Sequence, residues 1–241
     1  MKKTLTLALA ATLAATTLSA KCGGDEDRWF TPLEVALFSP LQLPFYDRDV
    51  YGIRLDLAYG RALDVYGLDL GVVNVNNGYV GGIQAGAFNW VDGVIGGIEA
   101  GVLANVSTRG AYGLQVSGVA NVGQGEFGGV QAALANNFSY FYGVQFAGIF
   151  NRTDNESYGL SAAFCNYIKC NHHGVEIGVF NLSKALIGAQ FGVFNCVFDK
   201  AEGLQLGLFN GAKRLNGVQI GLLNFVETGL FTVMPVLNAN F

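Results

Sequence analysis

A tandem repeat of about fifteen residues is the feature that most constrains how this chain can fold. Each unit starts at a glycine, alternates aliphatic with small or polar residues, and reaches an asparagine, as in residues 203–210 (GLQLGLFN). Successive units start at these glycines, of which the thirteenth is degenerate: Gly52, Gly67, Gly82, Gly97, Gly113, Gly129, Gly143, Gly159, Gly174, Gly188, Gly203, Gly217 and Gly229. In some units the asparagine comes one residue later, as at Asn105, Asn121 and Asn151, which predicts a single-residue bulge in a strand.

The alternation within each unit has period two over seven or eight residues, which is typical of β-strands rather than helices. The connecting segments, such as 107–110 and 212–214, are short and mostly polar, as turns are. The chain has 34 Gly, 51% hydrophobic and 13% charged residues, a composition that argues against disorder. We therefore predict an all-β protein with no helix after residue 20.

The N-terminal residues have the layout of a signal peptide for export. Lys2 and Lys3 precede an apolar run over 5–13, and small residues end at Ala20, so cleavage is predicted after residue 20. Removing two lysines leaves 14 − 2 = 12 basic against 18 acidic residues, which argues against a nucleic-acid partner. Lipidation of Cys22 needs a small residue directly before it, and Lys21 stands there instead.

The predicted organisation is a signal peptide (1–20), a lead-in (21–50) and one repeat β domain (51–241). Prolines interrupt the lead-in, and residues 34–38 are expected to form a first strand, which brings the total to about fourteen strands. The chain is expected in the outer membrane or at the cell surface.

The favoured architecture is a transmembrane up-and-down β-barrel of about fourteen strands, with the aliphatic residues facing outer-membrane lipid. Tyrosines directly before several repeat glycines suit an aromatic girdle, and Phe241 ends an alternating segment as in outer-membrane barrels. The opposite face of each strand would line the lumen of a narrow pore. The expected lumen-facing residues are Arg54, Asp56, Asp69, Gln84, Glu99, Gln115, Gln131, Gln145, Glu176, Gln190, Gln205 and Gln219.

The alternative is an exported, soluble β-solenoid in which each unit forms one coil and equivalent residues stack as ladders. The glutamine and glycine positions would then form a flat outer face for binding or adhesion. Two sets of apolar residues are expected in the core of such a solenoid. They are the residues two before the repeat glycine (Val65, Val80, Ile95, Phe127, Phe141 and Leu215) and those next to the asparagine (Trp90, Val106, Val122 and Phe138).

The tandem Gly-aliphatic-Gln-aliphatic-Gly-aliphatic-aliphatic-Asn pattern resembles the bacterial surface-repeat proteins, which are exported or anchored by lipid. The lead-in 50–60 (VYGIRLDLAYG) and the ending 235–238 (PVLN) are similar to theirs as well. The resemblance covers residues 33–241 and implies a surface location. It brings no activity and no catalytic residues.

Few residues are placed for chemistry. Cys165, Cys170, His172 and His173 lie close in sequence, but their spacing matches no common zinc site. Cys165, Cys170 and Cys196 leave the pairing of disulfides open. Glu99 and Glu176 replace the repeat glutamine five units apart, roughly 24 Å along a sheet, which is too far for a catalytic carboxylate pair. We therefore predict a protein that is not an enzyme and has no catalytic residues, no cofactor and no metal, with a structural or pore-like role in the barrel and an unidentified ligand.

Overall fold

The structure is a computed structural model that describes residues 20–21, 29–38, 41–43, 49–229 and 232–241. Nearly all of the predicted signal peptide, and Cys22, lie outside these residues. In the described part of the chain 87% of the residues are in strands and none is in a helix, so it contains no helix long and apolar enough to span a membrane. The all-β prediction is confirmed.

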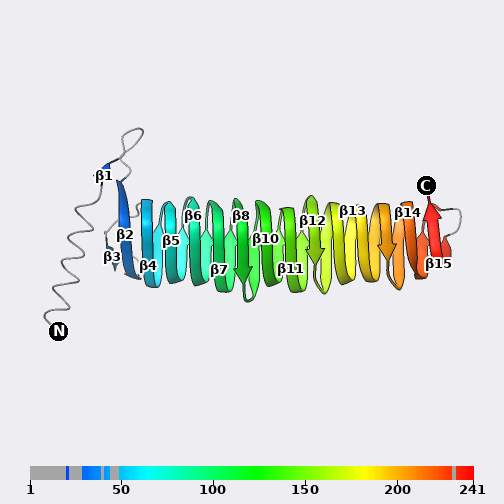
Figure 1. The fold of residues 1–241 in the computed structure, drawn as a ribbon, viewed down its shortest axis with the longest axis horizontal. Coiled ribbons are helices and arrows are strands. Elements are labelled where there is room, and N and C mark those ends of the chain that lie inside the picture. The colour runs from blue at the N-terminus through cyan, green and yellow to red at the C-terminus, as the bar shows by residue number, and fades with distance from the viewer. Residues whose placement is uncertain (1–19, 22–28, 39–40, 44–48, 230–231) are drawn as a thin grey trace. The chain divides into compact units, whose positions relative to one another are not determined.

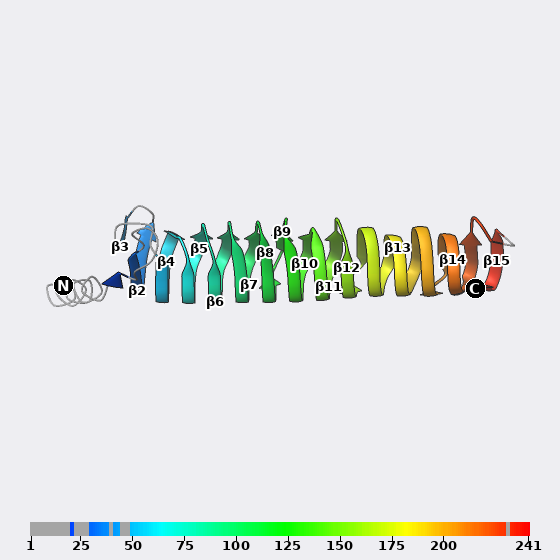
Figure 2. The same ribbon diagram turned by 90° about the horizontal axis from the view of Figure 1, so that it is seen from above.

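The strands form a β-solenoid of about 12 turns, so the predicted barrel is wrong and the alternative architecture is right. Successive repeats pair in parallel and in register, with Gly52 beside Gly67 and Gly67 beside Gly82. An up-and-down barrel would need antiparallel neighbours. Each repeat instead closes one coil and returns beside its own start, and the coils lie side by side within each unit in Figures 1 and 2.

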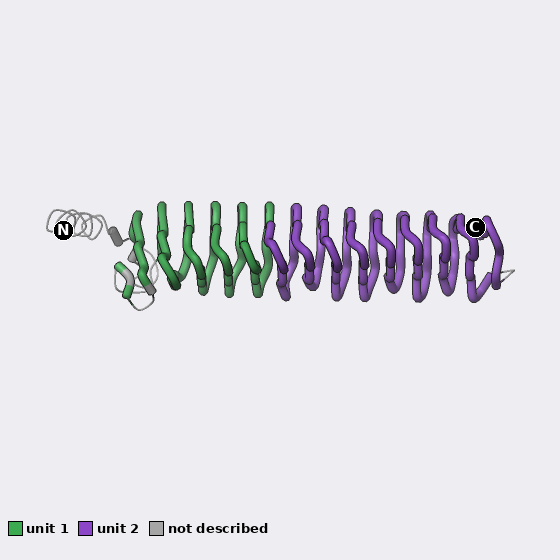
Figure 3. Tube along the Cα trace, turned by 90° about the horizontal axis from the view of Figure 1, so that it is seen from below, with its two compact units in different colours: residues 1–115 green, residues 116–241 purple. Residues whose placement is uncertain are grey.

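The chain divides into two compact units, residues 1–115 and 116–241 (Figure 3). The first unit contains β1 (Ala20–Lys21), β2 (Trp29–Phe38), β3 (Leu41–Leu43), β4 (Asp49–Ala62), β5 (Val65–Asn76), β6 (Val80–Val91), β7 (Val94–Ser107) and most of β8 (Gly110–Ser117). The second contains β9 (Ala120–Gly123), β10 (Glu126–Phe138), β11 (Tyr140–Thr153), β12 (Ser157–Ala162), β13 (Cys165–Leu206), β14 (Phe209–Val226) and β15 (Val233–Asn240). β13 runs without interruption through more than two coils.

The repeat glycine is required by both its conformation and its surroundings. Gly188 has φ +142°, and a Cβ at this position would lie 2.0 Å from the carbonyl oxygen of Gly174 in the preceding coil. An L side chain rarely adopts such a φ, and no real Cβ lies this close to a backbone oxygen. The glycine column therefore lets adjacent coils stack at the spacing of hydrogen-bonded strands.

Two of the three predicted bulges, those before Asn105 and Asn151, are present as shifts in strand register. One residue lies between Gly86 and Phe88 of β6, whereas two lie between their partners Gly101 and Ala104 in β7. Asn105 therefore still lies beside Asn89. In β11 the shift opposite Ala133 and Ala135 likewise brings Asn151 beside Asn136. The extra residue is absorbed locally and the asparagine column stays aligned.

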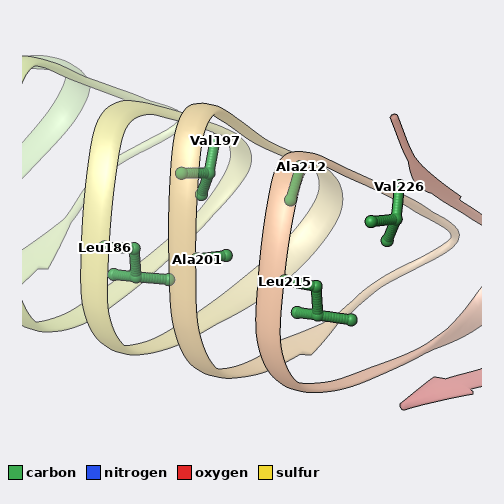
Figure 4. Close-up of a cluster of buried hydrophobic side chains, with 6 residues drawn as sticks. All are labelled: Leu186, Val197, Ala201, Ala212, Leu215 and Val226. Carbon is green, nitrogen blue, oxygen red and sulfur yellow. The ribbon is translucent and has the colours of Figure 1, made fainter. Parts of the chain in front are cut away.

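The apolar core lies between the residue two before most of the repeat glycines and the residue two after about half of the asparagines. In unit 2 this core contains Leu186, Val197, Ala201, Ala212, Leu215 and Val226, which point into the coils from both sides (Figure 4). In unit 1, Val50, Ala62 and Val65 form a second cluster. The core predicted two residues before the glycine is thus confirmed.

The core predicted next to the asparagine is only partly right, because period two places the residue directly after an inward asparagine on the outside. Trp90 follows Asn89 and is 38% exposed, whereas Val91, one residue further, is fully buried. Val106 and Val122 directly follow an asparagine and are only half-buried. Phe138 is buried because it comes two residues after Asn136.

Both described ends of the solenoid carry strands that do not follow the repeat. The first strand expected at 34–38 lies inside β2, against which β1 and β3 pair antiparallel. The degenerate thirteenth unit at Gly229 does not form a coil, because β15 turns back and pairs antiparallel with β14. Pro235 falls in the register shift of this pairing, where a residue without an N–H group is tolerated.

Candidate functional site

The twelve residues predicted to face a lumen lie inside the coils, and each is 4% exposed or less. Unit 1 contains Arg54, Asp56, Asp69, Gln84, Glu99 and Gln115, and unit 2 contains Gln131, Gln145, Glu176, Gln190, Gln205 and Gln219. Their inward position means that the glutamine and glycine face is not the outer binding face expected for a solenoid. Polar side chains can be buried in this way because they hydrogen-bond from coil to coil.

In unit 2 the glutamines form an internal column along the stacking direction. Gln219 Nε2 donates to Gln205 Oε1 at 2.7 Å, and Gln205 Nε2 donates to Gln190 Oε1 at 2.8 Å. Gln190 Nε2 in turn donates to Glu176 Oε2 at 3.3 Å and to Ser183 Oγ at 3.0 Å. A primary amide suits this column because it both donates and accepts.

The asparagines form a second internal column. In unit 2, Asn181 Nδ2 donates to Asn195 Oδ1 at 2.8 Å and to the carbonyl oxygen of Phe191 at 3.0 Å, and its Oδ1 accepts from Asn166 Nδ2 at 2.9 Å. The second glycine of the repeat makes room for this amide. At Gly192 a Cβ would lie 2.6 Å from Asn181 Nδ2.

A charged cluster occupies the glutamine column near the start of unit 1. Arg54 Nε lies 2.7 Å from Asp69 Oδ1 and 3.0 Å from Asp56 Oδ2, and Arg54 Nη1 donates to Asn76 Oδ1 at 2.8 Å. Gln84 Nε2 donates to Asp69 Oδ2 at 2.8 Å. Burial raises the pKa of Asp56 to about 7, although Arg54 acts in the opposite direction.

Burial also raises the pKa of the two glutamates in the glutamine column. Desolvation raises the pKa of Glu99 to about 8, with Gln115 Nε2 donating to its Oε2 at 2.7 Å. It raises the pKa of Glu176 to about 7, against the opposing hydrogen bonds from Gln190 and Ser183. Glu99 and Glu176 belong to different units, and each is enclosed by its own coils.

Apolar side chains cover the outside of the coils. We call the outward apolar residues between each repeat glycine and its asparagine the outer apolar surface. In unit 2 it includes these side chains, each 39–60% exposed: Val130, Leu134, Phe146, Ile149, Phe164, Ile177, Phe194, Leu206, Leu208, Ile220 and Leu222. In unit 1 it includes Ile53, Leu55, Leu57, Val72, Ile83, Ile98, Val102, Leu103 and Leu114, each 39–69% exposed.

Charged residues lie on a different part of each coil. Every charged residue of unit 2 except the buried Glu176 lies in a segment between an asparagine and the next repeat glycine. We call these segments the turn edge. Ion pairs join adjacent coils there, with Arg214 Nη2 2.6 Å from Asp199 Oδ1 and Lys169 Nζ 2.7 Å from Asp154 Oδ1.

Stacked aromatic rings accompany both parts of the surface in unit 2. Tyr142, Tyr158 and His173, each directly before a repeat glycine, have ring centroids 5.2 and 4.6 Å apart and nearly parallel planes. On the outer apolar surface, Phe194 stacks with its neighbours Phe180 and Phe209 at 5.1 and 4.9 Å. Rings stacked this way present their edges, not their faces, to the surroundings.

The cysteines and histidines considered for metal binding do not converge. Cys165, Cys170 and Cys196 are free thiols. His172 points into the coil, where burial lowers its pKa to about 4, whereas His173 stacks outward on Tyr158. In the described ranges, no group of three or more His, Cys, Asp or Glu residues is placed to hold a metal ion.

Sequence reasoning identified the outward aliphatic residues but assigned them to membrane-spanning strands, and for a solenoid it expected the glutamine face outside. The signal for the correct assignment was the recurrence of asparagine and glutamine at fixed positions, because an amide can donate to and accept from the same amide of the adjacent coil. Comparison with protein-family models, curated proteins and solved structures finds no match to this chain.

Proposed function

We propose that this protein is an exported, non-enzymatic β-solenoid at the cell surface that acts as a binding or adhesion surface. The observation that carries the proposal is the distribution of side chains across each coil. The amide columns are inside and the aliphatic residues outside, so that within unit 2 an apolar surface extends over successive coils. Contiguous exposed apolar surface of this kind marks sites of interaction.

The surroundings of the ionisable residues also support a non-enzymatic role. Catalytic acids and bases need access to a substrate, and Glu99 and Glu176 are each 1% exposed or less. Their hydrogen bonds to Gln115 and Gln190 tie them into the glutamine column. Their perturbed pKa values are accounted for by burial within a stacked polar column.

Adsorption to defined surfaces tests the proposal. The exported protein should adsorb to an alkyl-coated sensor and much less to a hydroxyl-coated one. Replacing Ile177, Leu206 and Ile220 by threonine keeps β-propensity but makes three exposed positions polar, and should reduce adsorption to the alkyl surface.

The matched control replaces three exposed residues of the turn edge in the same unit, Lys184, Lys213 and Glu227, by threonine. This variant should adsorb like the unmodified protein. If both variants lose adsorption equally while retaining β-type circular dichroism, the outer apolar surface is not the binding surface and the proposal fails.

A further inference from the structure

We infer that the outer apolar surface binds the acyl region of a lipid leaflet, with the turn edge left in the headgroup layer and water. This inference rests on the proposed function and names the partner of the same surface. It assigns a monotopic arrangement, in which the solenoid lies in one leaflet and does not cross the bilayer.

The extent of the apolar surface around the coil favours lipid over a second protein. In unit 2, exposed apolar residues occupy the strand after the glycine (Ile177, 46%), the bend that follows it (Leu208, 52%) and the position before the asparagine (Phe194, 39%). A second copy packed on one of these would leave the others exposed to water. A fluid apolar phase covers all of them at once.

Strand pairing and the asparagine column provide hydrogen-bond partners that lipid cannot provide. Water is absent from the hydrocarbon layer, so each polar group must find a partner within the protein. The backbones of adjacent coils pair in parallel over their strands, as between β13 and β14. The asparagines of unit 2 and the glutamines at 190, 205 and 219 are buried and hydrogen-bond from coil to coil, so the glycine-to-asparagine segments turn their apolar side to the surroundings.

The turn edge carries the exposed charged residues of unit 2, together with a few exposed apolar residues such as Ile187 and Phe198. Asparagine and the next glycine are separated by seven or eight residues, which is half of a fifteen-residue coil, so the turn edge lies across the coil from the bend at Leu208. A coil with one charged edge and an apolar remainder has the amphipathic cross-section of protein segments that lie in the membrane interface.

Aromatic side chains mark the boundary between the two parts. The Tyr142–Tyr158–His173 row directly precedes the glycines, where the turn edge meets the outer apolar surface. The hydroxyl of Tyr158 donates to Glu156 Oε2 of the turn edge at 3.2 Å. Tyrosine rings favour the level of the lipid headgroups because one end is apolar and the other is polar.

Partition into vesicles of zwitterionic phosphatidylcholine tests the inference, because uncharged lipid removes electrostatic attraction to the turn edge. The exported protein should cosediment with the vesicles. The Ile177→Thr, Leu206→Thr, Ile220→Thr variant should partition at least about 30-fold more weakly, and the Lys184→Thr, Lys213→Thr, Glu227→Thr variant about as strongly as the unmodified protein. All three proteins share the same N-terminal segment, so a difference between them cannot come from that segment.

A fluorescence measurement keeps the inference testable if the triple variant fails to fold. Leu222 is 60% exposed on the outer apolar surface of unit 2. In a Trp29→Phe, Trp90→Phe background, a Leu222→Trp variant carries its single tryptophan on this surface, and vesicles of brominated phosphatidylcholine should quench its fluorescence. Absence of quenching and of cosedimentation would overturn the inference.

The outcomes separate this inference from the proposed function. Adsorption to the alkyl surface without binding to vesicles would leave the binding surface in place and remove lipid as its partner. A concentration-dependent dimer that is lost in the threonine variant and does not bind vesicles would identify a second copy as the partner instead. Failure of both adsorption and vesicle binding would overturn both proposals.

Discussion

Glycine residues of this chain fall into two groups that should differ sharply in tolerance to substitution. Gly188→Ala would place a Cβ 2.0 Å from a backbone oxygen at φ +142°, whereas a Cβ at Gly211 meets no atom closer than 3.9 Å. We expect Gly188→Ala to lower the free energy of unfolding by roughly 3 kcal/mol or more. Gly211→Ala should be neutral or stabilising by up to about 1 kcal/mol. Urea denaturation of the two variants measures the difference, and equal midpoints would contradict the role of the glycine column.

The asparagine column should respond to the loss of a single amide. Asn181→Ala removes the partner of Asn166 Nδ2, of Asn195 Oδ1 and of the Phe191 carbonyl. Because these groups remain buried, we expect a loss of about 2–4 kcal/mol. The exposed Asn216 at the turn edge provides the comparison, and Asn216→Ala should change stability by less than about 0.5 kcal/mol. Denaturation curves that shift equally for both would show that the column contributes nothing.

At the scale of the element, charged residues of β4 and β5 stand at positions where other coils carry the amides of the glutamine column. Arg54→Gln leaves Asp56 and Asp69 without their cation and should cost about 3–5 kcal/mol. Adding Asp56→Gly and Asp69→Gln restores the residues typical of those repeat positions and should recover most of that loss. Thermal unfolding of the single and the triple variant tests this. A triple variant no more stable than the single one would show that the cluster is not an exchangeable part of the column.

The last strand protects an edge. β15 pairs antiparallel with β14, and its pairing is interrupted at Pro235, next to Val236, which has φ +69°. An unpaired edge of this kind templates association with other chains. Removing residues 232–241 should therefore uncover the edge of β14 and produce concentration-dependent oligomers, detectable by sedimentation velocity. Pro235→Val is the control, since it leaves β15 in place. A truncated chain that stays monomeric would show that β15 does not act as a cap.

The sequence was sufficient to predict the strands, their bulges and the alternation of each side chain between two faces. It did not determine which face is enclosed, because period two is the same whether Gln205 faces a lumen, a solvent-exposed surface or the inside of a coil. Parallel and antiparallel neighbours were also indistinguishable locally. The path of the chain decides this: fifteen residues suffice to go once around and return beside the start. Tyr142 and Phe241 suggested a membrane barrel, but in the structure Tyr142 belongs to a stacked outer row and Phe241 is 93% exposed after β15.

For the whole molecule, burial of acidic groups in the interior predicts an unusual dependence of stability on pH. The pKa values of Asp56, Glu99 and Glu176 are raised to about 7, 8 and 7 in the folded protein. The folded state therefore binds more protons than the unfolded state between about pH 4 and pH 8. The stability contributed by these groups is fully present below their unfolded pKa values and is lost as pH rises through 7 to 8.

Replacing the two glutamates by glutamine should flatten this dependence. Glu99→Gln removes the cost of keeping a carboxyl neutral, and at pH 7 should stabilise the protein by roughly 3 kcal/mol; Glu176→Gln should act in the same direction. Urea midpoints at pH 5, 7 and 8.5 measure the slope. A midpoint that rises with pH in the unmodified protein would contradict the assignment of these buried carboxyls.

The amide columns also bear on how the length of such a chain can change. Each coil offers its neighbour the same donors and acceptors that it receives from the coil before it, so only the two ends require special partners. The cost of ending the stack is therefore fixed, whatever the number of coils between the ends. Duplication or deletion of a fifteen-residue stretch by recombination between repeats would add or remove a module without leaving a buried amide unmatched. This architecture therefore allows the number of repeats to vary, and the length of the outer apolar surface varies with it.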